Sequence, residues 1–215
     1  MARGRFDRAF QKHVISRLLD RGMRGVEPLR EELLAGVRGR VLEMGFGTGS
    51  NLAHYPTAGA IDELVAIEPA EGLAEIARAR MKAWSRETGV ATRLEVASGA
   101  RPLPLDPGSF DTIVLTFVLC SVREPEAMLA EARRLLAPGG QLVIAEHVAA
   151  PGGLRRHAQR AIRPAWKALL GGCDPLCDAR GALARAGFDT NEVEDRPLAL
   201  PWIVATGVVG RARPR

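Results

Sequence analysis

The sequence predicts an α/β fold in which helices flank a doubly wound, mainly parallel sheet of seven strands. Between residues 40 and 147, short apolar runs alternate with segments whose apolar residues recur at helical spacing. Strands that alternate with helices form parallel sheets with right-handed crossovers. The run Phe110–Phe117 has apolar residues on both faces, as a central parallel strand requires. A chain of 215 residues is long enough for one such domain.

The elements can be assigned from this periodicity in chain order. Helices are expected first, at residues 6–20 and Val26–Val37. The five strands of the alternating region are predicted at Arg40–Met44, Glu63–Glu68, Thr92–Ala97, Phe110–Phe117 and Gln141–Glu146. Between them we expect helices at Gly49–Tyr55, Ala70–Glu87 and Pro125–Leu136, and a turn at Pro138–Gly140. Two helices and two last strands complete the chain, at Ala158–Leu170, Asp178–Ala186, Asp189–Glu194 and Ile203–Val209.

Composition excludes several classes of protein. The apolar stretches without a charge, Thr112–Val122 and Leu198–Gly210, are 11 and 13 residues long, too short to span a bilayer. The first residues contain no apolar signal core. We therefore expect a cytoplasmic protein. Its 3 cysteines imply no disulfide framework.

A glycine-rich loop comes directly after the first predicted strand. Gly45, Gly47 and Gly49 stand at alternate positions, where they allow a sharp turn and close approach of a ligand to the main chain. An ordinary tight turn between strand and helix is the alternative. Glu68 ends the second strand, where a carboxylate can accept hydrogen bonds from both ribose hydroxyls. Loop and acid together predict a ligand of adenosine type.

Glu43 distinguishes between two such ligands. It ends the first strand just before the glycines, and its carboxylate would repel a pyrophosphate but attract a cationic amino group. Ser50 also occupies the last position of the GxGxxG pattern of dinucleotide sites. These observations favour S-adenosylmethionine. A nicotinamide-dependent dehydrogenase is the competing enzyme.

The loop also resembles a known family. Val41–Leu52, with Tyr55 and Pro56 after it, looks like motif I of class I S-adenosylmethionine-dependent methyltransferases. Other stretches within residues 38–150 agree, namely Ile67–Pro69, Leu103 and Pro104, Ser109–Asp111 and Leu136–Gly140. Finer features are similar to the methyltransferase-like subgroup that contains animal thiol methyltransferases: Leu119–Val122, Glu146–Ala149, and Trp166 with Cys173. The resemblance implies a small-molecule acceptor, such as a thiol or another sulfur or oxygen nucleophile.

The resemblance assigns roles around the glycine loop. It implies that Glu43 and Gly45 hold the methionine amino group of the cofactor. Gly47 and Gly49 would shape the loop, with Asn51 nearby.

It also implies contacts beyond that loop. Glu68 would bind the ribose, and Pro69 would pack against adenine. Thr116 and Phe117 would face the methionine part and the sulfonium. The adenine edge would lie along Ser98, Gly99 and Ala100. Many relatives carry an acid where Gly99 stands, so this chain departs from the common pattern there.

Two residues are candidates for catalysis. His147 comes after the fifth strand, where an imidazole can act as a base or orient the acceptor; a structural histidine is the alternative. Cys120 lies just past the fourth strand, and a buried apolar role is its alternative. Cys173 and Cys177 lack a second ligand pair, so no metal site is predicted.

The chain is expected to be a single methyltransferase domain with unequal charge along its length. We divide it into an N-terminal helical cap (1–38), a cofactor-binding core (39–150), and acceptor-side helices with the last strands (151–215). The net charge of +5 arises from basic flanks around an acidic centre. A basic run from Arg155 to Lys167 contains no acid, so an anionic acceptor, peripheral contact with a membrane surface, or the acidic core remain its possible partners.

Partners other than small molecules are not favoured. Aromatic residues make up only 5%, which leaves few platforms for stacking bases, so no nucleic-acid partner is expected. A non-catalytic cofactor- or RNA-binding protein is the remaining alternative.

Trp166, Leu169 and Leu170 are expected to form an apolar wall or part of the core, and Trp202 to be core. The sequence leaves the oligomeric state open.

Overall fold

The computed structural model describes residues 9, 11–57 and 59–215. The start of the helix expected at residues 6–20 lies outside the described residues. The N-terminal helical region that the structure does describe is broken into short pieces: η1 (Gln11–Ile15), α2 (Ser16–Gly22), η2 (Arg24–Val26) and α3 (Glu27–Leu34). Gly22 ends α2, Gly25 lies within η2, and Pro28 stands in the first turn of α3, where a missing N–H costs nothing.

The central sheet confirms the predicted fold class. Its strands are β1 (Gly39–Met44), β2 (Ile61–Ile67), β3 (Ala91–Glu95), β4 (Phe110–Thr116), β5 (Leu136–His147), β6 (Phe188–Asp189), β7 (Val193–Pro197) and β8 (Thr206–Pro214). The order is β3-β2-β1-β4-β5-β8-β6, and β7 pairs with β8. The first five strands are parallel, whereas β8 runs antiparallel to β5. The described part of the chain thus contains an 8-stranded sheet rather than one of seven strands.

The extra strand comes from one expected element that divides. The predicted strand Asp189–Glu194 is interrupted because the Asp189 carboxylate accepts the backbone N–H of Asn191 at 3.0 Å and closes a turn. The strand expected at Ile203–Val209 begins later, since η5 (Trp202–Val204) comes after Pro201. The turn expected at Pro138–Gly140 is instead an irregular part of β5, where the register with β4 shifts.

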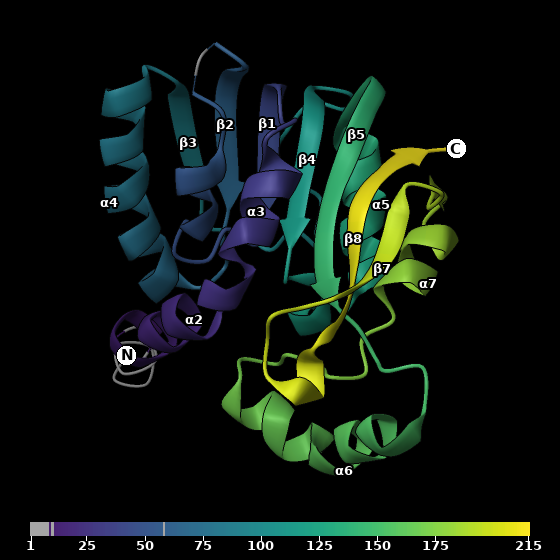
Figure 1. Ribbon diagram of the computed structural model, residues 1–215. Coiled ribbons are helices and arrows are strands. Elements are labelled where there is room, and N and C mark those ends of the chain that lie inside the picture. The colour runs from purple at the N-terminus through teal and green to yellow at the C-terminus, as the bar shows by residue number, and fades with distance from the viewer. Residues whose placement is uncertain (1–8, 10, 58) are drawn as a thin grey trace.

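Helices cover both faces of the sheet (Figure 1). The remaining ones are η3 (Ser50–His54), α4 (Glu71–Thr88), η4 (Leu119–Ser121), α5 (Pro125–Leu135), α6 (Gly153–Leu169) and α7 (Ala179–Arg185). The segment expected as a helix at Gly49–Tyr55 is therefore a short 3₁₀ helix. α6 begins five residues earlier than predicted and continues through Pro164.

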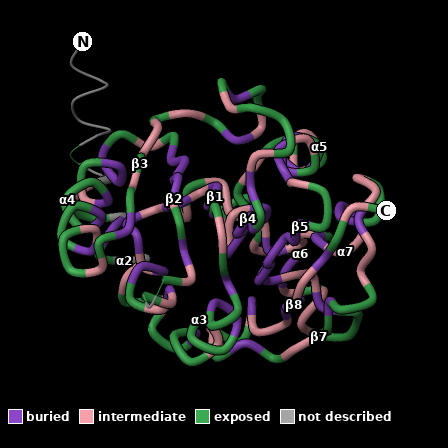
Figure 2. The backbone as a smooth tube through the Cα atoms, turned by 90° about the horizontal axis from the view of Figure 1, so that it is seen from above, coloured by how far each residue is buried: buried purple, intermediate pink, exposed green. Residues whose placement is uncertain are grey.

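Alternate residues of the central strands enter two separate apolar clusters. Leu42 and Met44 of β1 face α5 and α7, whereas Val41 faces α3 and α4. This two-sided burial explains the nearly continuous apolar runs of the central strands. Figure 2 shows the buried residues along the sheet and the exposed ones on the outer sides of the helices.

The carboxyl ends of the parallel strands carry the covering elements. In Figure 1, α2 and α6 lie beyond these ends, on the side where open α/β sheets bind ligands. Of the helices in the described residues, none is long and apolar enough to span a membrane.

Candidate active site

The β1–η3 loop has the backbone shape that its glycines predict. Gly45, Gly47 and Gly49 have φ of +82°, +60° and +83°, a region that other residues rarely adopt. A side chain at Gly45 would overlap Val118, so this glycine permits close approach of the loop after β4. Apart from Gly47 and its two chain neighbours, no atom of the described residues lies within 4 Å of the position a Cβ would take. The loop therefore has open space above its middle glycine.

Glu68 links this loop to the start of α4 by hydrogen bonds. Its carboxylate accepts the N–H of Gly47 at 2.8 Å and the N–H of Ala70 at 2.8 Å. Burial raises the pKa of Glu68, and these two backbone donors oppose the rise. The structure thus brings together the acid and the glycine loop, which the sequence had placed at the ends of β2 and β1.

Glu43 is the centre of a buried hydrogen-bond network. Its two oxygens accept from the Tyr55 hydroxyl at 2.6 Å and from Asn51 Nδ2 at 2.8 Å. The same Asn51 nitrogen lies 3.0 Å from Thr116 Oγ1, at the end of β4. Arg30, from α3, donates to the Asn51 side-chain oxygen. Three of the residues that the sequence pointed to, Glu43, Asn51 and Thr116, therefore belong to one connected network.

Burial has the largest effect on the pKa of the carboxyl group in this network. It raises the pKa of Glu43 to about 7, although the Tyr55 hydroxyl and the Arg30 guanidinium both favour the ionised carboxylate. The Arg30 guanidinium carbon also lies 5.5 Å from the centre of the Phe117 ring. No sequence signal pointed to Arg30, which stands on a helical segment without a motif. Tyr55 was visible only as part of the family motif.

The chain turns sharply where β4 ends. Phe117 has a φ of +56°, rare for a residue with a side chain, and its N–H donates to the Ala145 carbonyl at 2.7 Å. The buried Glu146 carboxylate then accepts the N–H groups of Val118 at 2.5 Å and Leu119 at 2.7 Å. Glu146 therefore fixes η4 beside the end of β5, a role that the sequence did not reveal.

The Ser98–Ala100 loop packs closely at the position where many relatives carry an acid. A Cβ at Gly99 would lie 2.6 Å from the Met44 methyl carbon and 3.0 Å from that of Met128. A side chain at this position therefore requires the flexible ends of both methionines, from β1 and α5, to move. Pro69 is exposed beyond β2, which leaves its ring free to pack on a ligand.

A second cluster joins three distant segments. The ligating atoms of Cys120, His147 and Cys173 all lie within 4.8 Å of one another. His147 Nε2 is 3.0 Å from Cys173 Sγ, and Trp166 Nε1 donates to the same sulfur at 3.4 Å. The Cys120 thiol and the His147 ring lower the pKa of Cys173 to about 4, against the effect of its burial. The sequence pointed to His147 and Cys120 as separate catalytic candidates and to Cys173 only through the family resemblance and its spacing to Cys177; it did not place the three together.

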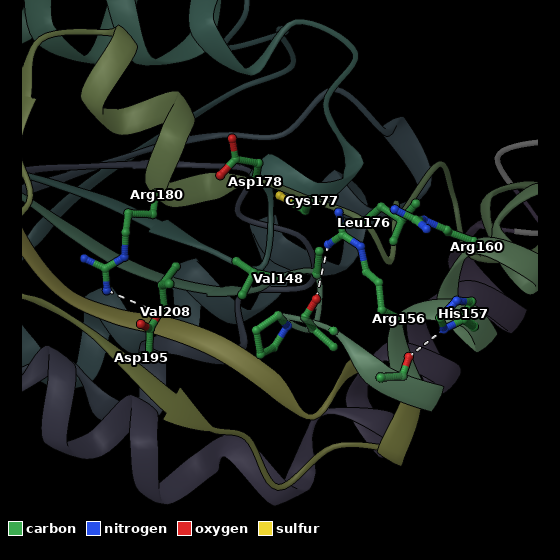
Figure 3. Close-up of a pocket in the computed structure, with 15 residues that line it drawn as sticks. Val148, Arg156, His157, Arg160, Leu176, Cys177, Asp178, Arg180, Asp195 and Val208 are labelled. Atoms are coloured by element: carbon green, nitrogen blue, oxygen red, sulfur yellow. Dashed lines mark hydrogen bonds and ion pairs between the residues drawn. The ribbon is translucent and has the colours of Figure 1, made fainter.

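A cavity of about 630 Å³ lies between the loop after β5, α6 and α7 (Figure 3). Basic side chains from two helices line it: Arg156, His157, Arg160 and Arg180. None of the described cofactor candidates is among its lining residues. Part of the basic run is neutralised nearby, since Arg163 and Lys167 pair with Asp174 at 2.6 and 3.0 Å.

The apolar wall expected on α6 is only partly formed. Trp166 is half-buried against Cys173, but Leu169 is 72% exposed. Trp202 is 51% exposed rather than core, with the Arg155 guanidinium 5.3 Å from the centre of its ring. This tryptophan stands after Pro201 in η5, so it lies outside β8 and the core beneath it.

Comparison with known proteins agrees with this geometry. The methyltransferase domain family model matches residues 42–144. The chain is 32% identical to thiol S-methyltransferase TMT1B of Homo sapiens, over 95% of this chain and 86% of the human protein. It is 34% identical to demethylmenaquinone methyltransferase of Clavibacter sepedonicus, over 61% of this chain and 52% of that protein.

The fold is shared with more distant proteins. A Leishmania major structure described as an SAM-dependent methyltransferase superposes with a TM-score of 0.67 at 15% identity, covering 98% of this chain and 82% of that one. At this level of identity the likeness concerns the fold alone.

Proposed function

Because the chain belongs to the class I S-adenosylmethionine-dependent methyltransferases, in the subgroup similar to thiol methyltransferases, we propose that it methylates the sulfur of a small-molecule thiol. One observation carries the choice of acceptor. The similarity to the human thiol S-methyltransferase extends over 95% of the chain, and so includes the elements beyond the cofactor-binding core. Those elements cover the carboxyl ends of the strands, where the acceptor has to enter.

The residues around the β1–η3 loop fit S-adenosylmethionine. The open space at Gly47 leaves room for a ligand against the main chain, and the buried Glu43 carboxylate offers a negative partner for a cationic amino group. Glu68 stands beside the same loop for the ribose, with the exposed Pro69 next to it for adenine. The cofactor supplies an activated methyl group on a sulfonium sulfur.

The protein has to position the acceptor and exclude water, since the methyl group is already activated. A thiol with a pKa of about 8.5 loses its proton far more easily than a hydroxyl does. His147 is the last residue of β5 and so lies at the carboxyl ends of the strands, where it could accept the proton of an acceptor. However, its Nε2 already contacts Cys173, so it can act on an acceptor only together with that cysteine.

A labelled-methyl screen tests the proposal. The protein is incubated with S-adenosylmethionine carrying a labelled methyl group and with panels of thiols, phenols, amines and quinones. We expect label in thiols. Label confined to quinones would contradict the proposal and favour the chemistry named for the Clavibacter relative.

The cofactor assignment is tested separately by binding. S-adenosylhomocysteine should raise the melting temperature of the protein, and NAD should not. Glu43→Ala should lose this response, whereas Asp62→Asn, which changes an exposed carboxylate on β2, should keep it. The opposite ligand preference would favour a nicotinamide-dependent dehydrogenase.

A further inference from the structure

Three side chains with metal-ligating atoms converge at the carboxyl ends of β4 and β5. Cys120 lies in η4, His147 is the last residue of β5, and Cys173 comes after α6. Their ligating atoms lie within 4.8 Å of one another, and His147 Nε2 is 3.0 Å from Cys173 Sγ. Since these residues are far apart in the sequence, only the fold gathers them.

The donor set and its spacing suit zinc. Two thiols and an imidazole are ligands that Zn²⁺ prefers, at about 2.3 Å to sulfur and about 2.0–2.1 Å to nitrogen. In a tetrahedral site these bond lengths place two sulfurs about 3.8 Å apart, and a sulfur about 3.6 Å from a nitrogen. In the structure all three atoms lie within 4.8 Å of one another and His147 Nε2 is 3.0 Å from Cys173 Sγ, so their separations are close to those that one ion requires. Because the set has no carboxylate, Mg²⁺ and Ca²⁺ are disfavoured.

The surroundings hold the three side chains in place. Cys120 and His147 are 5% and 4% exposed, and the half-buried Cys173 leaves a route of entry. Trp166 donates to the Cys173 sulfur at 3.4 Å, a contact that supports a thiolate ligand. The N–H of Asp174 donates to the Cys120 carbonyl at 2.7 Å, which ties the loop after α6 to η4.

The histidine faces the cluster through one of its two nitrogens. His147 Nε2 lies 3.0 Å from the Cys173 sulfur, whereas Nδ1 is buried and has no hydrogen-bond partner among the described residues. A metal ion would bind at Nε2 in place of the proton that this nitrogen shares with the cysteine sulfur.

We propose that Cys120, His147 and Cys173 bind one zinc ion and leave its fourth position open to the acceptor. Three protein ligands with one open position are typical of catalytic rather than structural zinc. The cluster lies at the same carboxyl ends of the strands as the glycine loop. Val118 packs on Gly45 of that loop, and Cys120 stands two residues after Val118.

The role of the open position rests on the proposed function. An acceptor thiol bound there gives its proton to water and is held as a thiolate. Its sulfur forms the new bond to the methyl carbon while the sulfonium bond to that carbon breaks. The electron pair of the broken bond stays on the leaving sulfur, so S-adenosylhomocysteine and a methyl thioether are the products.

Cobalt substitution tests the metal site without measuring activity. Metal-free protein is titrated with Co²⁺, and we expect one ion per chain with the visible bands of a tetrahedral site and a thiolate-to-cobalt charge-transfer band. Zn²⁺ should displace the cobalt. No such spectrum in the wild-type protein would overturn the inference.

Variants identify the ligands. Cys120→Ser, His147→Gln and Cys173→Ser should each weaken metal binding by more than the roughly 10- to 100-fold typical of changes to residues that only support a ligand. Cys177→Ser is the matched control, because this half-buried thiol is nearby but outside the cluster. Far-ultraviolet circular dichroism verifies that each variant is folded. A spectrum unchanged in both Cys120→Ser and Cys173→Ser would overturn the assignment.

Adding 2-mercaptoethanol to the cobalt protein tests the open position. We expect a stronger charge-transfer band as a third thiolate binds, and an unchanged spectrum would overturn that part. A changed spectrum without methylation of any thiol would support the metal site and refute the proposed function. Equal thiol methylation by metal-free protein in the presence of a chelator would support the function and refute the role of the metal.

Discussion

The buried carboxyl group of Glu43 should make cofactor binding depend on pH. Burial raises the pKa of this group to about 7, so below that pH the ligand-free protein holds it in the protonated form. The charged groups that act on it are Arg30, which favours the anion, and Glu68, which opposes it; the Tyr55 hydroxyl also stabilises the anion by a hydrogen bond. A ligand with a cationic amino group binds best to the anion.

The size of the effect can be worked out from the pKa. At pH 5, two units below the value of about 7, ionising Glu43 costs about 2.7 kcal/mol. Binding of S-adenosylhomocysteine should therefore be about 100-fold weaker at pH 5 than on the plateau above pH 7, and should release close to one proton at low pH. The affinity should rise as pH increases through this window and then level off.

Isothermal titration calorimetry measures both effects. The dissociation constant is measured between pH 5 and pH 8, and proton release is obtained from buffers of different ionisation enthalpy. Glu43→Gln preserves the shape of the side chain but cannot ionise, so it should bind more weakly and without this pH dependence. Asp62→Asn is the control, since it removes an exposed carboxylate on β2. An equal pH dependence in the wild type and in Glu43→Gln would refute the reasoning.

Three further changes test the fold around the site. The raised pKa of Glu43 means that its contribution to stability falls as pH rises toward 7. Between pH 5 and pH 8, the free energy of unfolding in urea should therefore fall by about 2.7 kcal/mol more in the wild type than in Glu43→Gln. Gly45→Ala should destabilise the ligand-free protein by about 1–3 kcal/mol more than Gly47→Ala, because both have positive φ but only Gly45 is covered by Val118; equal midpoints with urea would contradict this. Gln159→Leu should cost about 2–4 kcal/mol, since the side chain accepts from the Ala150 N–H and donates to the Ile203 carbonyl, both at 2.9 Å; a loss below about 1 kcal/mol would show that α6 is held otherwise.

The fold was largely predictable because its signals are local. A parallel strand buried on both faces leaves a continuous apolar run, and a covering helix leaves a period of 3.6 residues. The less regular segments were mispredicted for equally local reasons. The Asp189 turn split one expected strand, and the irregular start of β5 replaced an expected turn.

The sequence by itself determined the glycine loop and the acids Glu43 and Glu68, because each is recognisable from its place at the end of a strand. Only the tertiary structure decided which residues surround them. Arg30 reaches the Glu43 network from α3, and Cys173 meets His147 from the loop after α6. Such contacts depend on how helices cross the carboxyl ends of the sheet, which no local pattern encodes. Burial then decides the protonation of Glu43. Its carboxyl group would be fully ionised in water at neutral pH, but inside the fold its pKa is about 7.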